Sequence, residues 1–189
     1  MQNQLKDFHH YKGDDLTRFE KVERKVLEII LSIESDEARE DSKIFEFMHA
    51  CGSIQVARIL AQKRGLNVDI AATATILHDI QTIISGKHKD HAKIGAPIAQ
   101  KILNEVGGFS KDEIETITQA ILHHSEKEIY SKDPYTELVK DADVFECSLY
   151  KNAESFYRIH KPEHIYKEYV KRIKKVREEL GLKPEEVFR

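Results

Sequence analysis

The 189-residue sequence contains no tryptophan, two cysteines, two methionines, four prolines and eight glycines. With so few residues that interrupt regular structure, most of the chain is free to form long elements. Cys51 and Cys147 are too few and too far apart for a disulfide framework or a cysteine zinc knuckle. We therefore expect two buried, reduced thiols, as in a cytoplasmic protein, and not a disulfide-stabilised secreted domain.

Long apolar runs and an excess of one charge are absent as well. No run approaches the ~20 apolar residues that span a bilayer, and residues 1–15 are polar and of mixed charge, unlike a signal peptide. The chain has 30 Lys and Arg against 33 Asp and Glu, a net charge of −3. We expect a soluble, cytoplasmic protein that binds neither membrane nor nucleic acid; the sequence leaves self-association open.

The apolar residues recur mostly at three- and four-residue spacing, which predicts helices joined by short turns. Ser110 with Glu113 forms a capping box, and Pro134 suits the first turn of a helix. No strand pattern or internal repeat interrupts this series. We predict an all-α single domain over residues 1–189, with helices over about 15–35, 42–64, 69–84, 90–106, 110–124, 134–152 and 163–180.

The expected helix over residues 69–84 is apolar on all sides, which indicates that it is buried. It carries the dipeptide His78-Asp79 into the interior, where an unpaired carboxylate costs several kcal/mol. A divalent cation would offset that charge and use the imidazole lone pair. The pair therefore predicts a metal site with Asp79 at its centre.

Six of the ten histidines fall between His49 and His124. On a helical wheel His49 shares a stripe with Phe45, Met48, Val56 and Ile59, and Gly52 leaves room there for another group. His91 shares a face with isoleucines of the next helix, where Pro97 either kinks the helix or marks its start. The doublet His123-His124 lies near an expected helix end. His9, His10, His88, His160 and His164 have polar surroundings and are expected at the surface.

The ordered set His49, His78-Asp79, His91, His123-His124 and Asp143 resembles the HD superfamily of metal-dependent phosphohydrolases. The resemblance covers about 95 residues, and His91-Ala-Lys-Ile-Gly-Ala is similar to a helix start in that family. It implies an HD-domain helical bundle with N- and C-terminal helical extensions and a metal-binding core at about residues 41–152.

The resemblance also implies the ligand sets. One metal would be held by His49, His78, Asp79 and Asp143, and a second by Asp79, His91, His123 and His124. Helical phase alone favours Asp141, which lies nearer the stripe of Leu138 and Ala142, so the residues leave Asp141 and Asp143 as alternatives.

The expected cofactor is a divalent transition metal, with two ions and with Fe or Mn favoured, because imidazole and carboxylate ligands suit Fe, Mn, Ni, Co or Zn better than Mg. Metal binding can lower the pKa of water toward ~7, so a metal-activated hydroxide would attack a phosphate ester or nucleotide. Asp79 would be the catalytic residue at the shared position. Lys87 and Lys140 are candidate substrate-binding residues, with Lys89 and Lys93 as alternatives.

Two departures from the family pattern are visible after the dipeptide. Gln81 and Thr82 stand where many relatives have Gly and then Lys or Glu, so the general acid has no candidate from the pattern. The Gly-Tyr-Pro tripeptide of cyclic-dinucleotide phosphodiesterases is absent, which disfavours that substrate class.

Two rival functions remain open from the sequence. Some HD-fold proteins are di-iron oxygenases with the same ligands, and a non-catalytic module that senses a nucleotide is the other alternative. The basic residues of the last helix are interpreted as a solvated outer face, because glutamates alternate with them. They are Lys167, Lys171, Arg172, Lys174, Lys175 and Arg177.

Overall fold

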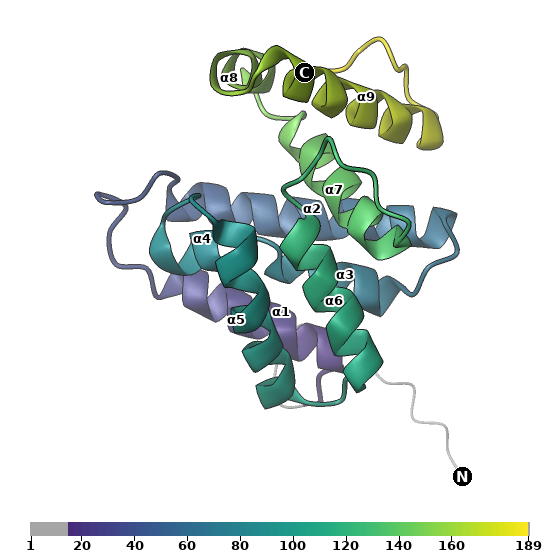
Figure 1. Cartoon of the computed structure of the whole chain (residues 1–189). Coiled ribbons are helices and arrows are strands. Elements are labelled where there is room, and N and C mark those ends of the chain that lie inside the picture. The colour runs from purple at the N-terminus through teal and green to yellow at the C-terminus, as the bar shows by residue number, and fades with distance from the viewer. Residues whose placement is uncertain (1–14, 189) are drawn as a thin grey trace.

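The computed structural model describes residues 15–188, which form helices joined by turns, with no strand among them (Figure 1). The prediction of an all-α fold is confirmed. Residues 1–14, which include His9 and His10, lie outside the described residues. The helices are α1 (Arg18–Leu31), α2 (Lys43–Lys63), α3 (Val68–Leu77), α4 (Ile80–Ser85), α5 (His91–Val106), α6 (Lys111–His123), α7 (Pro134–Cys147), α8 (Ala153–His160) and α9 (Glu163–Glu179).

Two hydrophobic clusters organise the helices into a larger bundle and a smaller upper layer (Figure 1). The first cluster joins α1, α3, α4, α5 and α6 and includes Ile54 of α2. The second joins α2 and α7 to α8 and α9 through side chains such as Leu60 and Ile173. Helix α3 contributes to both clusters, and every residue from Ile70 to Leu77 is buried. The apolar sequence on all sides of α3 therefore correctly indicates a buried helix.

Local signals fix most helix starts. Ser110 accepts a hydrogen bond from the backbone N–H of Glu113, whose carboxylate accepts one in return, so the predicted capping box is present. Ser42 caps α2, and Asp133 caps α7 just before Pro134. Among residues 15–188, no helix combines the length and the apolar character that crossing a bilayer requires.

Two predicted helices are wrong in extent. The helix expected over 69–84 is divided at His78-Asp79, where α3 ends and α4 begins. The helix expected over 134–152 ends at Cys147, and a separate helix, α8, follows Asn152. Asn152 has a left-handed backbone, with φ of 68°, which stops helical propagation and which asparagine tolerates better than most residues.

Two predicted faces are corrected as well. Met48 and Ile59 are about half exposed, because the buried side of α2 runs instead through residues such as His49, Ala50 and Ile54. In α9, Arg172 is not part of a solvated face: its side chain is 1% exposed. By contrast, His160 and His164 are exposed, as the sequence indicates.

The burial of Arg172 is explained by a buried carboxylate on α7. Asp141 is fully buried and accepts hydrogen bonds of 2.8 Å from Arg172, Arg64 and Lys175. Arg172 also pairs with Glu137 at 2.8 Å. Three cations from α9 and the C-terminal end of α2 thus converge on one acid and hold α9 against the bundle.

Replacing Asp141 by Asn should lower the free energy of unfolding by about 3–5 kcal/mol, because it removes the one buried carboxylate that Arg172, Arg64 and Lys175 share. Urea denaturation monitored by circular dichroism measures this loss. Lys175→Met is the matched control: its side chain is 51% exposed, so it should cost at most about 1 kcal/mol. Equal losses in the two variants would contradict a buried network centred on Asp141.

The same variant has a pH signature. Burial opposes the charge of Asp141, but Lys175, Arg64 and Arg172 lower its pKa below the usual value. A lowered folded-state pKa contributes stability at neutral pH that is lost as the pH falls through that pKa. Asp141→Asn should therefore lose less stability than the wild type between neutral and acidic pH.

Candidate metal centre

Six side chains from five segments of the chain meet at one place in the bundle. His49 comes from within α2, and Asp143 from within α7. The break between α3 and α4 supplies His78 and Asp79, the first turn of α5 supplies His91, and the end of α6 supplies His124. Successive residues of one helix point in different directions. Because the helix is interrupted at residues 78–79, the side chains of both His78 and Asp79 can face the cluster.

Asp79 divides its two carboxylate oxygens between two pairs of histidines. Its Oδ2 lies 3.1 Å from His78 Nε2 and 3.5 Å from His49 Nε2. Its Oδ1 lies 3.4 Å from His91 Nε2 and 3.4 Å from His124 Nε2. The donor atoms accordingly form two close groups that share Asp79: one with His49 and His78, the other with His91 and His124.

The orientation of the imidazoles shows which nitrogen is free. The Nδ1 atoms of His78, His91 and His124 each lie 2.6–2.7 Å from a backbone carbonyl oxygen, and each must donate its proton there. His49 Nδ1 lies 2.6 Å from Glu146 Oε2. In neutral rings all four Nε2 atoms then carry lone pairs directed into the cluster.

Those lone pairs face one another at short range, and this supports a cation site. His49 Nε2 lies 3.2 Å from His78 Nε2, and His91 Nε2 lies 3.0 Å from His124 Nε2. Two acceptors at such separations repel each other unless a cation or a proton lies between them. Imidazole nitrogens with carboxylate oxygens are ligands that divalent transition metals favour. The side chains present therefore fit a metal ion.

The two aspartates that the sequence leaves as alternatives have different surroundings. Asp143 Oδ1 lies 3.6 Å from His49 Nε2, and its other oxygen accepts a hydrogen bond from Lys127. Asp141 points to the opposite side of α7, into the ion-pair network with α9. The structure thus brings Asp143, and not Asp141, to the histidines. The apolar stripe of Leu138 and Ala142 favours the wrong aspartate, because these residues pack in the hydrophobic cluster that contains α9.

The shifted pKa values of Asp79, Asp143 and His124 favour the protonation states that bind a cation. Burial opposes ionisation of Asp79, yet His78, His124 and His49 hold its pKa well below the usual range. Burial also opposes ionisation of Asp143, whose pKa is lowered by Lys127, His78 and His49. Burial lowers the pKa of His124 to about 4, which keeps that imidazole neutral and able to bind a metal at neutral pH.

Three of the sequence-predicted site residues lie away from the cluster. His123 is adjacent to His124 but points outward and pairs with Glu126 at 2.9 Å. Lys140 is buried with its ammonium 2.6 Å from the carbonyl oxygen of Ile129. Lys87 is more than half exposed and lies 3.7 Å from Glu40. The structure brings none of these three side chains to Asp79.

Sequence reasoning missed Lys127, which lies beside Asp143. Its side chain is 2% exposed, and its ammonium donates hydrogen bonds to Asp143 and, at 2.7 Å, to the carbonyl oxygen of His124. The only signal in the sequence is its spacing of three residues from His124. Lys127 supplies the cluster with a fixed positive charge.

A second missed group lies behind α4. Arg39 donates hydrogen bonds to the carbonyl oxygens of Thr82 and Ile83, both at 3.0 Å, and pairs with Glu46 at 3.1 Å. Burial and the charge of Asp79 raise the pKa of Glu46 to about 7. An arginine and a glutamate from elsewhere in the chain therefore lie against residue 82, where the family pattern leads one to expect a charged side chain.

Gly86 makes the close approach of Arg39 possible. It ends α4 with φ of 71°, a left-handed conformation that suits glycine. A Cβ at this position would lie only 2.9 Å from the Cβ of Arg39. The turn at Gly86, which follows His78 and Asp79, is thus fixed by its backbone conformation and by the guanidinium of Arg39 together.

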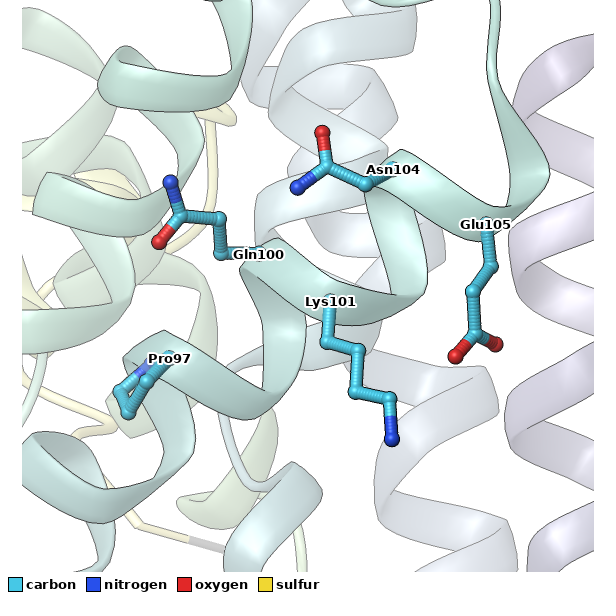
Figure 2. Close-up of a pocket in the computed structure, with 5 residues that line it drawn as sticks. All are labelled: Pro97, Gln100, Lys101, Asn104 and Glu105. Carbon is cyan, nitrogen blue, oxygen red and sulfur yellow. The ribbon is translucent and has the colours of Figure 1, made fainter.

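A surface depression elsewhere on the molecule is not part of this centre. Figure 2 shows its lining residues, Pro97, Gln100, Lys101, Asn104 and Glu105, all of them along the outer side of α5. None of them is a donor of the cluster, and Glu105 forms an ion pair with Lys25 of α1. Pro97 is exposed within α5, so the carbonyl group that its missing N–H leaves unpaired can bind water.

Comparison with known proteins agrees with the fold. The sequence model of the HD domain family matches residues 47–147, more than half of the chain. A crystal structure of a predicted HD superfamily hydrolase from an uncultured Thermotogales bacterium superposes with a TM-score of 0.54 at 22% identity. The alignment covers 84% of this chain and 88% of that one. No curated protein matches the sequence.

The chain therefore belongs to the HD domain family. The match begins two residues before His49 and ends four residues after Asp143, so it contains every member of the cluster. The solved structure, at its low identity, supports the helical fold alone.

The positions of the adjacent histidines generate a direct test. His124→Ala should lower the bound transition metal by about one equivalent, because losing a ligand costs at least the 10–100-fold in affinity known for supporting groups. His123→Ala should leave the metal content unchanged, since its ring points away. Elemental analysis of the purified variants gives the stoichiometry. An equal loss of bound metal in the two variants would indicate that His123 is also a metal ligand.

Proposed function

We propose that this protein is a metal-dependent phosphohydrolase that acts on a phosphate ester or a nucleotide. The observation that carries the proposal is the division of the Asp79 carboxylate between two histidine pairs. Such a carboxylate suits two divalent ions that share one ligand, an arrangement common among enzymes that cleave phosphate esters. The word hydrolase in the name of the Thermotogales protein is consistent with this assignment.

Two ion positions follow from the donor atoms. One would be held by His49, His78, Asp79 and Asp143, and the other by Asp79, His91 and His124. The mixture of imidazole and carboxylate favours Fe or Mn, and allows Zn, Ni or Co, over Mg. When bound, such ions supply an acidified water molecule and neutralise charge on a phosphoryl group.

The exposure of the cluster's side chains suggests the side from which a substrate would reach it. The side chains of Asp79, His91 and Asp143 are 16–18% exposed, whereas those of His49, His78 and His124 are almost fully buried. Substrate would approach from the side of the three partly exposed ligands. That asymmetry keeps the rest of the cluster dry, which strengthens its electrostatic interactions.

Lys127 is the cation best placed to assist at this entrance. Its ammonium is held by Asp143 and by the His124 carbonyl oxygen, so it has little freedom to move. It keeps Asp143 ionised and adds positive potential where an anionic phosphate would arrive. Lys87 remains a proposed contact for a larger substrate, whereas the ammonium of Lys140 is directed to Ile129 and is not proposed further.

The test is a hydrolysis screen with phosphomonoesters, phosphodiesters and nucleotides, after metal removal and reconstitution with Mn²⁺ or Fe²⁺. Reconstituted wild type should release phosphate or cleave a diester, and the metal-free protein should not. Asp79→Ala should abolish both metal binding and hydrolysis while the helical circular-dichroism signal persists, because Asp79 serves both ion positions.

Asp112→Ala is a control, since that residue lies in the first turn of α6, away from the cluster. Hydrolysis by Asp79→Ala at most of the wild-type rate would contradict the proposal. Turnover of molecular oxygen by the iron-loaded protein, with no phosphate ester cleaved, would favour the di-iron oxygenase alternative.

A further inference from the structure

The four histidines of the cluster differ in what holds their Nδ1 atoms. His78, His91 and His124 lie at helix ends and donate to the carbonyl oxygen three residues earlier. His49 lies in the middle of α2, where the carbonyl groups of the preceding turn already accept helix hydrogen bonds. Ser53 Oγ of the same helix lies 3.3 Å from its Nδ1, and the closest partner comes from another part of the chain.

Glu146 of α7 is that partner. Its Oε2 lies 2.6 Å from His49 Nδ1, and both side chains are at least 90% buried. It follows Asp143 by three residues, so both project from the same face of α7. Gly52 provides the space: a Cβ there would lie 2.9 Å from Glu146 Cγ. The room that the sequence predicts beside Gly52 is filled by this carboxylate.

We propose that Glu146 is a positioning residue that holds the His49 ring with its Nε2 directed into the cluster, and so gives the ion position of His49, His78 and Asp143 the higher metal affinity. A carboxylate that accepts the Nδ1 proton of a metal-binding histidine fixes the ring and raises its basicity. The Nδ1 atoms of the other three rings have neutral carbonyl partners. Metal ions would then load in order, first at His49 and second at His91 and His124.

This inference rests on the metal binding of the proposed function, but not on the reaction. The negative charge of Glu146 is not needed to attract a cation, because Asp79 and Asp143 already supply negative charge. Its contact with His49 gives this third carboxylate a separate role. That role also explains why a buried glutamate is placed 2.6 Å from a histidine that faces two aspartates.

The experiment is a titration of the metal-free protein with Mn²⁺ alone, in competition with a chelating dye. Wild type should show two dissociation constants. Glu146→Gln keeps an acceptor oxygen of the same reach but removes the charge, so the tighter constant should weaken 10–100-fold and the weaker one should change by less than about threefold. Electron paramagnetic resonance of bound Mn²⁺ follows the two sites separately.

Glu126→Gln is the matched control. Glu126 makes the same kind of contact, at 2.9 Å, with the exposed His123, so its loss should alter neither constant. Gly52→Ala tests the same interaction from α2, because the added methyl group displaces the Glu146 carboxylate. It should reproduce the selective loss, including in the case that Glu146→Gln does not fold.

Unchanged constants in Glu146→Gln, or a parallel weakening of both, would overturn the inference. Wild type that binds two Mn²⁺ ions with equal affinity would also overturn it and leave the phosphohydrolase proposal standing. Ordered binding without hydrolysis of any phosphate ester would instead refute the proposed reaction alone. A wild-type protein that binds no Mn²⁺ would overturn both.

Discussion

The carboxylate of Asp79 faces four imidazole nitrogens, two at each oxygen, and this convergence constrains most of the bundle. Acceptor atoms packed 3.0–3.2 Å apart in a buried place need positive charge between them. To bring them together, α3 must end at Leu77 so that two successive residues face the same point. Helix α5 begins at this point and α6 ends there, whereas His49 and Asp143 project from within α2 and α7.

Helix α7 connects this centre to the rest of the molecule through its two sides. Asp143 and Glu146 face the histidines, whereas Asp141 binds the cations of α2 and α9. Arg172 of α9 also donates a hydrogen bond of 2.7 Å to the carbonyl oxygen of Lys127, whose ammonium binds Asp143. Helix α9 thereby supports α7 on the side opposite the histidines, and some of its charged residues are structural and not merely solvent-exposed.

The sequence could predict what depends on local interactions. Helix starts at Ser42 and Ser110 follow from capping, and the all-round apolar pattern of α3 indicates its burial. The sequence could not predict side-chain orientations that depend on how the helices pack against one another. Nothing local separates His123 from His124, because the rotation of α6 against α3 decides which ring points inward. Lys127 and Glu146 were missed because their partners lie 16 and 97 residues away, and the break at His78 follows from the cluster itself.

If Asp79 holds two metal ions, anomalous X-ray diffraction from crystals grown with Mn²⁺ or Fe²⁺ should locate both of them. Data collected at the absorption edge of the metal should show two peaks, one beside Oδ2 of Asp79 near His49 and His78, the other beside Oδ1 near His91 and His124. A single peak bound by His123, or peaks that do not touch Asp79, would contradict the account.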